Sequence, residues 1–279
     1  MSTVVHLNLD DALPTDLPGV QQVDAREWGP QLRFSAPARL VAEFQSAIVP
    51  QLAPFVIYGS GDFHHLSALW IAAAAAPSVV VSFDNHPDWD VRPPRWSCGS
   101  WVNRALELPQ VEQVSVWGCG NFECWWPAQL FGNRRAERAG KLEVHPWADN
   151  RSPRDRQRRG AILGENWREH FGAFSQRLHG AKIYVTIDLD CLRSEDAVTS
   201  WESGRFATDD LEWALRELRA QAQIVAGDIC GAFSPPIYAR RKQRFASEMD
   251  HPRLARPPFA QAQRINVGTV ERLLRTLAD

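Results

Sequence analysis

The sequence has no long hydrophobic run and no pairing of cysteines typical of disulfide frameworks or thiolate zinc sites. A membrane-spanning helix needs about 18–20 consecutive apolar residues, and no stretch of this sequence approaches that length. The first residues lack the basic segment and apolar stretch of a secretory signal. The five cysteines are scattered, odd in number and form no CxxC pair. These absences argue against a membrane or secreted protein and favour a reducing cytoplasm as the location.

Neither sign of charge is in excess. The 31 Lys and Arg residues nearly balance the 33 Asp and Glu residues, which leaves a formal net charge of -2. This balance gives no reason to expect nucleic acid or an anionic membrane as a partner. Apolar residues make up 44% of the 279 positions, enough for the core of a globular protein.

Short apolar runs alternate with amphipathic stretches along the chain. Several runs are rich in Val and Ile and apolar on both faces, as buried parallel strands are. We therefore predict an α/β protein with a three-layer α/β/α fold and a mainly parallel sheet, in which residues 1–279 form a single domain. The predicted strands are 4–9, 55–58, 79–83, 111–117, 142–145, 183–187 and 224–226. The predicted helices are 37–49, 65–75, 99–107, 165–178, 208–221 and 269–277.

Acidic and histidine side chains gather just after four of these apolar runs, where ligands bind in open α/β sheets. The segment VVVSFDNHPDWD places Asp84, His86 and Asp88 at alternating positions after a strand. Alternating side chains of an extended segment point the same way, so these three could converge on one point. A cation would offset their repulsion and desolvation, and the mixture of carboxylate and imidazole suits Mn²⁺ or Zn²⁺.

Three further apolar runs end in a similar way. KIYVTIDLDCL contains Asp188 and Asp190, and FVIYGSGDFHHLSALW contains a glycine turn followed by His64 and His65. Either histidine could reach the same site. IVAGDICGAFSPP places Asp228 after a fourth strand. These groups exceed the needs of one ion, whereas two divalent ions that share carboxylates would use most of them and would activate a water between them.

Taken in order, these segments resemble motifs of the arginase–agmatinase (ureohydrolase) superfamily. That family has a GGDH-type turn, a DAHxD segment, an SxDxDxxDP segment and an ExxP-like segment. The corresponding segments here are GSGDFHH (59–65), DNHPD (84–88), TIDLDCL (186–192) and GDICGAFSPP (227–236). The stretch VWGCGNFE (116–123) also resembles the family's strand and turn between the second and third motifs.

The resemblance, which covers roughly residues 54–236, implies an arginase-like fold and a centre of two metal ions. Members of the family typically bind Mn²⁺, and Zn²⁺ or another divalent ion is an alternative. His64 is preferred to His65 because HHLSAL aligns with the start of the family's helix when Phe63 is treated as an extra residue in the turn. The implied ligands are two bridging carboxylates and one histidine–aspartate pair for each ion: Asp84 and Asp188, His64 with Asp88, and His86 with Asp190.

Three departures from the family pattern concern the substrate. The DP pair of the third motif is missing. The acid that binds the substrate guanidinium in the family would fall near Gly231, so it is absent here. The segment SCGSWVN has no counterpart of the proton-shuttling histidine. Because a buried guanidinium without a carboxylate partner costs several kcal/mol, ordinary arginine is disfavoured as a substrate. Asp90, His65 and Asp228 are the catalytic candidates that could replace the missing acid or shuttle.

The leading hypothesis is hydrolysis of a non-peptide C–N bond in a guanidino or amidino compound, a small-molecule substrate, by hydroxide activated at two metal ions. One alternative, from the related deacetylase branch, is hydrolysis of a linear amide by a single zinc. Another is a non-catalytic metal-binding protein that kept the ion site. The family also tends to form homo-oligomers, although nothing in the sequence itself indicates one.

Two segments have no predicted role in this site. Residues 150–160 (NRSPRDRQRRG) are strongly basic, which is typical of a solvated loop and also compatible with a lid or an anion-binding patch. The Pro- and Arg-rich residues 234–258 look like a long excursion, and loops of that size are often functional or mobile.

Overall fold

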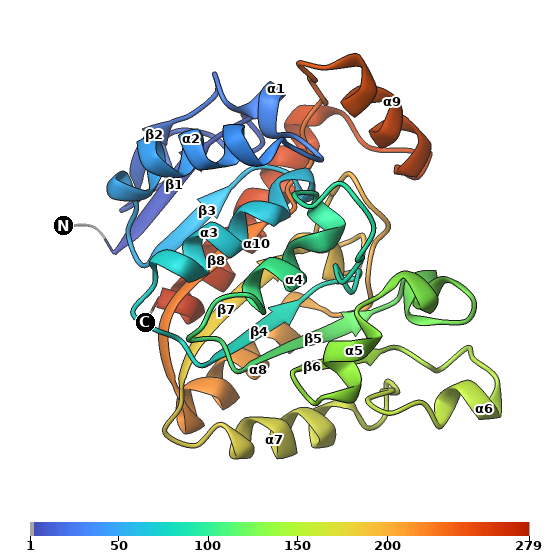
Figure 1. Cartoon of the computed structure of the whole chain (residues 1–279). Helices are drawn as coiled ribbons and strands as arrows, with labels where there is room; N and C mark the ends of the chain where they lie inside the picture. Colours follow the sequence, from blue (N-terminus) through green and yellow to red (C-terminus); the bar gives the residue numbers. More distant parts are fainter. Residues whose placement is uncertain (1–2, 279) are drawn as a thin grey trace.

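The computed structural model describes residues 3–278 and has one eight-stranded sheet as its centre (Figure 1). The strands lie in the order β2-β1-β3-β8-β7-β4-β5-β6, and every pairing between them is parallel. All carboxyl ends therefore lie at the same edge of the sheet. The strands are β1 (Val4–Asn8), β2 (Gln21–Asp24), β3 (Phe55–Tyr58), β4 (Val79–Phe83), β5 (Gln113–Cys119), β6 (Leu142–Pro146), β7 (Lys182–Asp188) and β8 (Gln223–Cys230).

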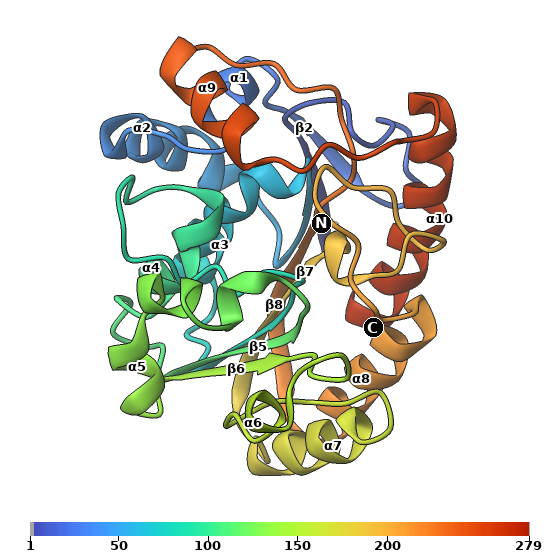
Figure 2. The ribbon, with the colours of Figure 1, turned by 90° about the vertical axis from the view of Figure 1, so that its right-hand side faces the viewer.

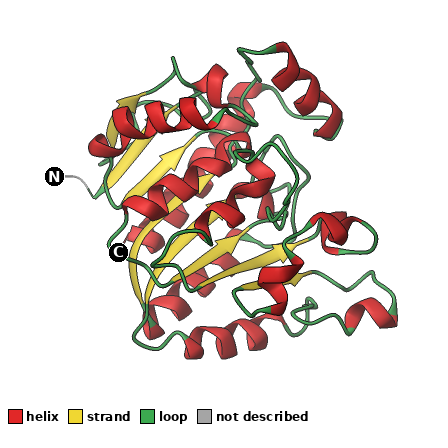
Figure 3. Cartoon of the chain, viewed as in Figure 1, coloured by secondary structure: helices red, strands yellow, loops and turns green. Residues whose placement is uncertain are grey.

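Helices cover both faces of this sheet, as the view along its edge and the colouring by secondary structure show (Figures 2 and 3). One face carries α2 (Ala38–Ile48), α3 (Ser67–Ala73), α4 (Trp101–Ala105) and α5 (Arg134–Arg138). The opposite face carries α7 (Trp167–Arg177), α8 (Thr208–Gln221) and α10 (Phe259–Ala278). The remaining helices are α1 (Gly29–Leu32), α6 (Pro153–Arg156) and α9 (Arg241–Asp250), and α9 lies beside α1.

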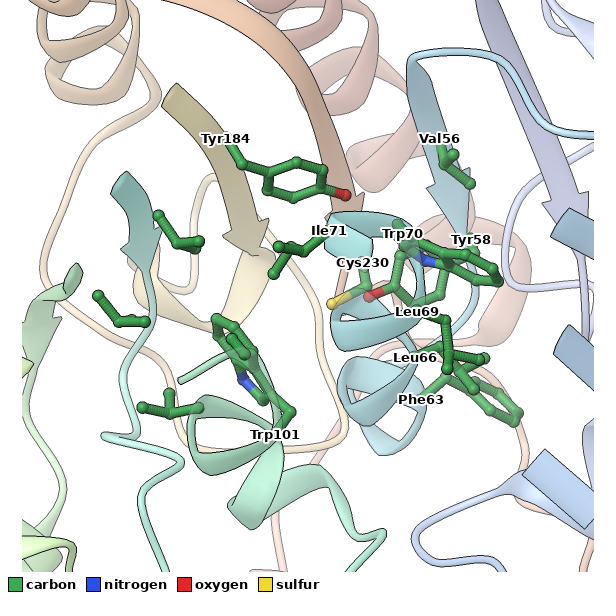
Figure 4. Close-up of a cluster of buried hydrophobic side chains, with 14 of the residues drawn as sticks. Val56, Tyr58, Phe63, Leu66, Leu69, Trp70, Ile71, Trp101, Tyr184 and Cys230 are labelled. Carbon is green, nitrogen blue, oxygen red and sulfur yellow. The ribbon is translucent and has the colours of Figure 1, made fainter. Parts of the chain in front are cut away.

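The alternation of side chains along each strand divides the apolar core into two clusters, one on each face. On β3, Val56 and Tyr58 belong to one cluster, and Phe55 and Ile57 belong to the other. Figure 4 shows part of the first cluster, where side chains of α3 pack against those of the sheet. Each fully buried large apolar side chain contributes about 1.5–3 kcal/mol to stability, so both faces hold the central strands in place.

The prediction of a three-layer α/β/α fold with a parallel sheet is confirmed. The sequence prediction missed the edge strand β2, because its residues QQVD are polar and largely exposed and show no apolar run. It also missed α9, which lies within the Pro- and Arg-rich excursion. The C-terminal helix begins at Phe259, ten positions before the predicted start at Thr269, and continues through Gly268. Among the described helices, none has both the length and the apolarity of a membrane span.

Candidate metal centre

The four predicted motifs meet because they follow four strands that are adjacent in the sheet. The order β3-β8-β7-β4 places these carboxyl ends side by side, although the strands are distant in the sequence. A 3₁₀ helix at Gly61–Leu66 follows β3, and a second one at Leu189–Cys191 follows β7. The side chains that the sequence predicted as metal ligands are all buried at this edge: His64, Asp84, His86, Asp88, Asp188 and Asp190.

His64 forms the first group of possible ligands. Its Nδ1 atom lies 3.1 Å from Asp84 Oδ2 and 3.2 Å from Asp88 Oδ2. On the other side of the ring, Nε2 lies 3.0 Å from Thr186 Oγ1, which orients the imidazole. One atom from each of His64, Asp84 and Asp88 lies within 4.8 Å of the other two, as a shared ion requires.

His86 forms the second group. Its Nδ1 atom lies 2.8 Å from Asp190 Oδ2 and 3.7 Å from Asp84 Oδ1. Backbone amides fix the carboxylates, since Asn85 N–H donates to Asp190 Oδ1 and His86 N–H donates to Asp84 Oδ1. Possible ligand atoms of Asp84, His86 and Asp190 again lie within 4.8 Å of one another. Asp84 therefore belongs to both groups, with one oxygen turned to each histidine.

The expected convergence of Asp84, His86 and Asp88 on a single point is wrong. His86 and Asp88 point to different groups and share only Asp84. The backbone turns at Asp88, whose φ of +44° lies outside the extended region. Strict alternation of side chains holds only along extended chain, and it ends before Asp88.

Asp188 lies between these groups and is held by two glycines. Its Oδ2 atom is 3.5 Å from His64 Nδ1, and its Oδ1 atom accepts a hydrogen bond from Asp190 N–H. A Cβ atom on Gly61 would meet Asp188 Oδ2 at 2.7 Å, and one on Gly231 would meet Asp188 Oδ1 at 2.2 Å. Both positions need glycine because the carboxylate packs directly against their backbone.

The carboxyls at this centre lack sufficient positive charge to be ionised together. Burial and the charge of Asp84 raise the pKa of Asp88 to about 7 and that of Asp190 to about 6. Burial and Asp190 raise the pKa of Asp188 well above its usual range. For Asp84 burial acts in the same direction, but the favourable interactions with the nearby imidazoles of His64 and His86 outweigh it and lower the pKa to about 2.

These residues fit a pair of divalent cations. Asp84 Oδ2 is fully buried and accepts no hydrogen bond among the described residues, which is rare for a carboxylate oxygen. Two cations would neutralise the four carboxylates and satisfy this oxygen at the same time. The six side chains offer only oxygen and imidazole nitrogen, a donor set suited to Mn²⁺ or Zn²⁺.

A third possible group, His64 with Asp228 and Cys230, fits a metal less well. Asp228 already accepts hydrogen bonds from Tyr184 Oη at 2.6 Å and Thr186 Oγ1 at 2.7 Å. Its oxygens are therefore satisfied by hydroxyl groups. Through Thr186, Asp228 supports the orientation of His64 rather than facing an ion.

None of the three catalytic candidates from the sequence lines the pocket above the metal centre. Asp90 is paired with Arg92 outside it. His65 is completely buried, neither of its ring nitrogens has a hydrogen-bond partner within residues 3–278, and burial lowers its pKa to about 3. Asp228 lies behind His64.

Besides predicted metal ligands, the pocket is lined by residues that the sequence prediction missed. It has a volume of about 520 Å³ including its open mouth, and its wall contains Glu123, Trp201, Glu202 and Asp250. Glu123 lies in the VWGCGNFE stretch that resembles the family, but no pattern within that stretch singles it out. Asp250 ends α9, so the excursion of residues 234–258 does reach the site.

A buried ionic network fixes α9 next to the pocket. His251 Nε2 lies 2.8 Å from Asp62 Oδ1, while Arg33 Nε donates to Asp62 Oδ2 at 2.7 Å. The His251 ring stacks on Trp201 with centroids 4.1 Å apart, and Trp201 makes an edge contact with His86. The chain after α9 is thereby tied both to the turn that carries His64 and to the second ligand group.

No family model matches the chain. An uncharacterised protein from Thermotoga maritima is 27% identical over 205 residues, which are 73% of this chain and 68% of that relative.

Solved structures share the fold over nearly the whole chain. Proclavaminate amidino hydrolase from Streptomyces clavuligerus has a TM-score of 0.57 at 12% identity, with 99% of this chain and 91% of that chain covered. Arginase from Bacillus cereus has a TM-score of 0.56 at 13% identity, with 98% and 97% covered. Formimidoylglutamase from Bacillus subtilis has a TM-score of 0.54 at 15% identity, with 99% and 86% covered. The arginase-like fold that the sequence resemblance implies is thus confirmed.

Proposed function

We propose that this chain is a metal-dependent hydrolase of a non-peptide C–N bond in a guanidino or amidino compound. The observation that carries this proposal is the sharing of Asp84 between two groups of ligand atoms, one with His64 and Asp88 and one with His86 and Asp190. A shared carboxylate is the arrangement that a dinuclear centre requires. The arginase-like fold, with the groups at the carboxyl edge of its sheet, supports the same assignment.

In this proposal, two divalent ions, with Mn²⁺ preferred, would share Asp84 and Asp188. His64 and Asp88 would hold one ion, and His86 and Asp190 would hold the other. When bound, such ions supply Lewis acidity that makes a nucleophile of water near neutral pH. The protein orients the imidazole of His64 through Thr186 and fixes the carboxylates of Asp188 and Asp190 through backbone amides.

Substitution of the shared carboxylate tests the centre directly. Asp84→Ala should lower the bound metal from about two ions per chain to less than one, because its loss leaves Asp188 as the only shared carboxylate between two cations that repel each other. Elemental analysis of purified protein measures this, and unfolding curves of both proteins show whether the variant folds. Asp90→Asn is the control, since Asp90 lies outside the pocket and should leave the metal content unchanged. Two ions retained by Asp84→Ala would contradict the bridging role.

Metal content and product release separate this function from the alternatives. About two ions together with urea or ammonia released from guanidines support the dinuclear hydrolase. One zinc together with cleavage of linear amides would support the deacetylase-like reading. Bound metal without turnover of either class would indicate the non-catalytic protein, a reading favoured by Gly231 at the position of the family's guanidinium-binding acid.

A further inference from the structure

A second cavity is lined by α4, α5 and the chain next to them, apart from the pocket above the metal centre. It has a volume of about 1310 Å³ including its open mouth, and the two walls have no residue in common. Both helices cover the same face of the sheet (Figure 2). Asn133 Nδ2 donates to Asn103 Oδ1 at 2.7 Å, and Asn103 Nδ2 donates to the carbonyl oxygen of Asp90 at 2.8 Å. These hydrogen bonds between residues of the wall fix its shape.

The wall carries an excess of positive charge, with five cationic side chains and two carboxylates. The cations are Arg92, Arg95, Arg104, Arg135 and Lys141, and the carboxylates are Asp90 and Glu107. Asp90 is paired with Arg92, and Glu107 is shared by Arg95 and Arg104. The side chains of Arg135 and Lys141 form no hydrogen bond and no ion pair within residues 3–278. The carboxylates of the wall are therefore used by three of the cations, and the other two have none.

Arg104 is the least satisfied of these cations. Its side chain is only 12% exposed, and its Nη1 atom lies 2.8 Å from Glu107 Oε1. Neither Nη1 nor Nε donates a hydrogen bond among the described residues, although both atoms are buried. Burial lowers the pKa of Arg104, an effect that Glu107 opposes and the charge of Arg95 increases. Buried donors without acceptors are rare and costly, so negative charge brought into the cavity would stabilise this guanidinium.

The arrangement of the wall indicates which anion would fit. Arg104 belongs to α4, whereas Arg135 belongs to α5 and Lys141 precedes β6, so the cations come from separate elements. Leu106 and Ala136 add apolar surface to the same wall. A ligand with two anionic groups on a short carbon skeleton can contact the cations of both helices and this apolar surface at once. Guanidinium groups bind carboxylate and phosphate oxygens in the same forked geometry.

We propose that this cavity binds a small molecule with two anionic groups, either carboxylates or phosphates. Arg104 binds one group, and Arg135 with Lys141 binds the other. This site is additional to the proposed hydrolytic centre, and its ligand is not the substrate of that centre. The ligand lies next to the metal-binding loop, because Asp90 of the wall is two positions from Asp88 and the Val102 N–H of α4 donates to the carbonyl oxygen of Asp88 at 3.2 Å.

Calorimetry on the full chain loaded with Mn²⁺ tests this site. The probes are glutarate, propane-1,3-diyl bisphosphate and pentanoate, which matches glutarate in length but has a single charge. At least one of the two dianions should bind about tenfold more tightly than pentanoate, and the tighter one identifies the anionic group. Binding should weaken as the salt concentration rises. Metal analysis after each titration shows whether the probe has removed Mn²⁺.

Three substitutions each remove one cation from the wall. Arg104→Gln should weaken binding of the dianion by about tenfold, and Arg135→Gln and Lys141→Gln by about threefold each, because the last two side chains are exposed to solvent. Arg138→Gln is the matched control on α5, since Arg138 is exposed outside the cavity wall and should leave binding unchanged. Unfolding curves show whether the Arg104 variant folds, and the two exposed positions test the site independently of it.

Four outcomes would overturn this site. They are dianion binding no tighter than that of pentanoate, binding unchanged in the three cavity variants, and binding lost in Asp84→Ala alone, which would place the anion at the metal ions. The fourth is self-association in sedimentation that Lys141→Gln abolishes, which would assign the cavity to a contact between copies of the chain. Dianion binding that depends on the cavity residues supports the site even if no guanidine is hydrolysed, so its result is independent of the proposed function.

Discussion

At the scale of single residues, the candidate site depends on which side chains are absent as much as on which are present. By the sequence resemblance, the guanidinium-binding acid of the ureohydrolase pattern would fall near Gly231, and the φ of +102° at Gly231 disfavours any L side chain. A Cβ atom there would meet Asp188 Oδ1 at 2.2 Å and Leu189 N at 2.5 Å. An acidic side chain substituted at Gly231 would therefore clash with Asp188 and would not restore the missing guanidinium partner.

We expect Gly231→Ala to destabilise the fold by about 1–3 kcal/mol, because it combines backbone strain with a clash against Asp188. The displaced carboxylate should also weaken metal binding. Urea unfolding and metal titration measure the two effects. Gly268→Ala is the control, because a Cβ atom at this position of α10 would meet nothing within 4 Å. This variant should be more stable than the native chain by about 0.5–1 kcal/mol. Equal stability of the two variants would show that Gly231 is not constrained.

At the scale of elements, one buried arginine joins segments from both ends of the chain. The Arg33 side chain is 2% exposed and lies 2.7 Å from Asp62 Oδ2 and 3.3 Å from Asp10 Oδ2. It also donates to the hydroxyl and carbonyl oxygens of Ser234. Since Asp62 begins the turn that carries His64 and also contacts His251, this network sets the position of α9 relative to the metal centre.

Arg33→Met should destabilise the fold by about 3–5 kcal/mol, because two buried carboxylates lose their cation. The measurement is the free energy of unfolding from urea curves, together with the rate of proteolysis within residues 234–258, which should rise. Arg26→Met serves for comparison: both side chains of its ion pair with Asp24 are more than half exposed, so the loss of this pair should change the free energy of unfolding little. A similar loss of stability in both variants would show that burial of the network does not increase its contribution to stability.

At the scale of the whole molecule, a buried neutral histidine makes the fold sensitive to acid. His6 on β1 is 1% exposed, and burial lowers its pKa to about 4 from an ordinary value of 6.5. The unfolded chain then binds a proton at a higher pH than the folded chain does. The stabilisation is fully present above about pH 6.5 and is lost as the pH falls toward 4.

This linkage predicts that lowering the pH from 7 to 5 removes about 2 kcal/mol through His6 alone. Urea unfolding at the two pH values, in the presence of a chelator, measures the change. His6→Val should show a loss smaller by about that amount, whereas His179→Gln, at an exposed position, should behave like the native chain. An identical loss in His6→Val and the native chain would exclude His6 as the cause.

Much of this protein was determined by short-range patterns in the sequence. Apolar runs rich in Val and Ile predicted the central strands, because strands buried on both faces carry apolar side chains on both faces. The acids and histidines just after those strands predicted a gathering of charge at one edge of the sheet. The polar edge strand β2 and the helix α9 left no such pattern, because partly exposed elements carry a weak periodic signal.

Only the tertiary structure decided how the site is arranged and what surrounds it. The order β3-β8-β7-β4 brings four distant motifs together, and the turn at Asp88 divides their side chains between two groups that share Asp84. The selection of His64 over His65 as a neighbour of those carboxylates also depends on the rotation of one 3₁₀ helix. Asp250 reaches the pocket from the far end of the chain, and no local spacing encodes a contact that depends on folding.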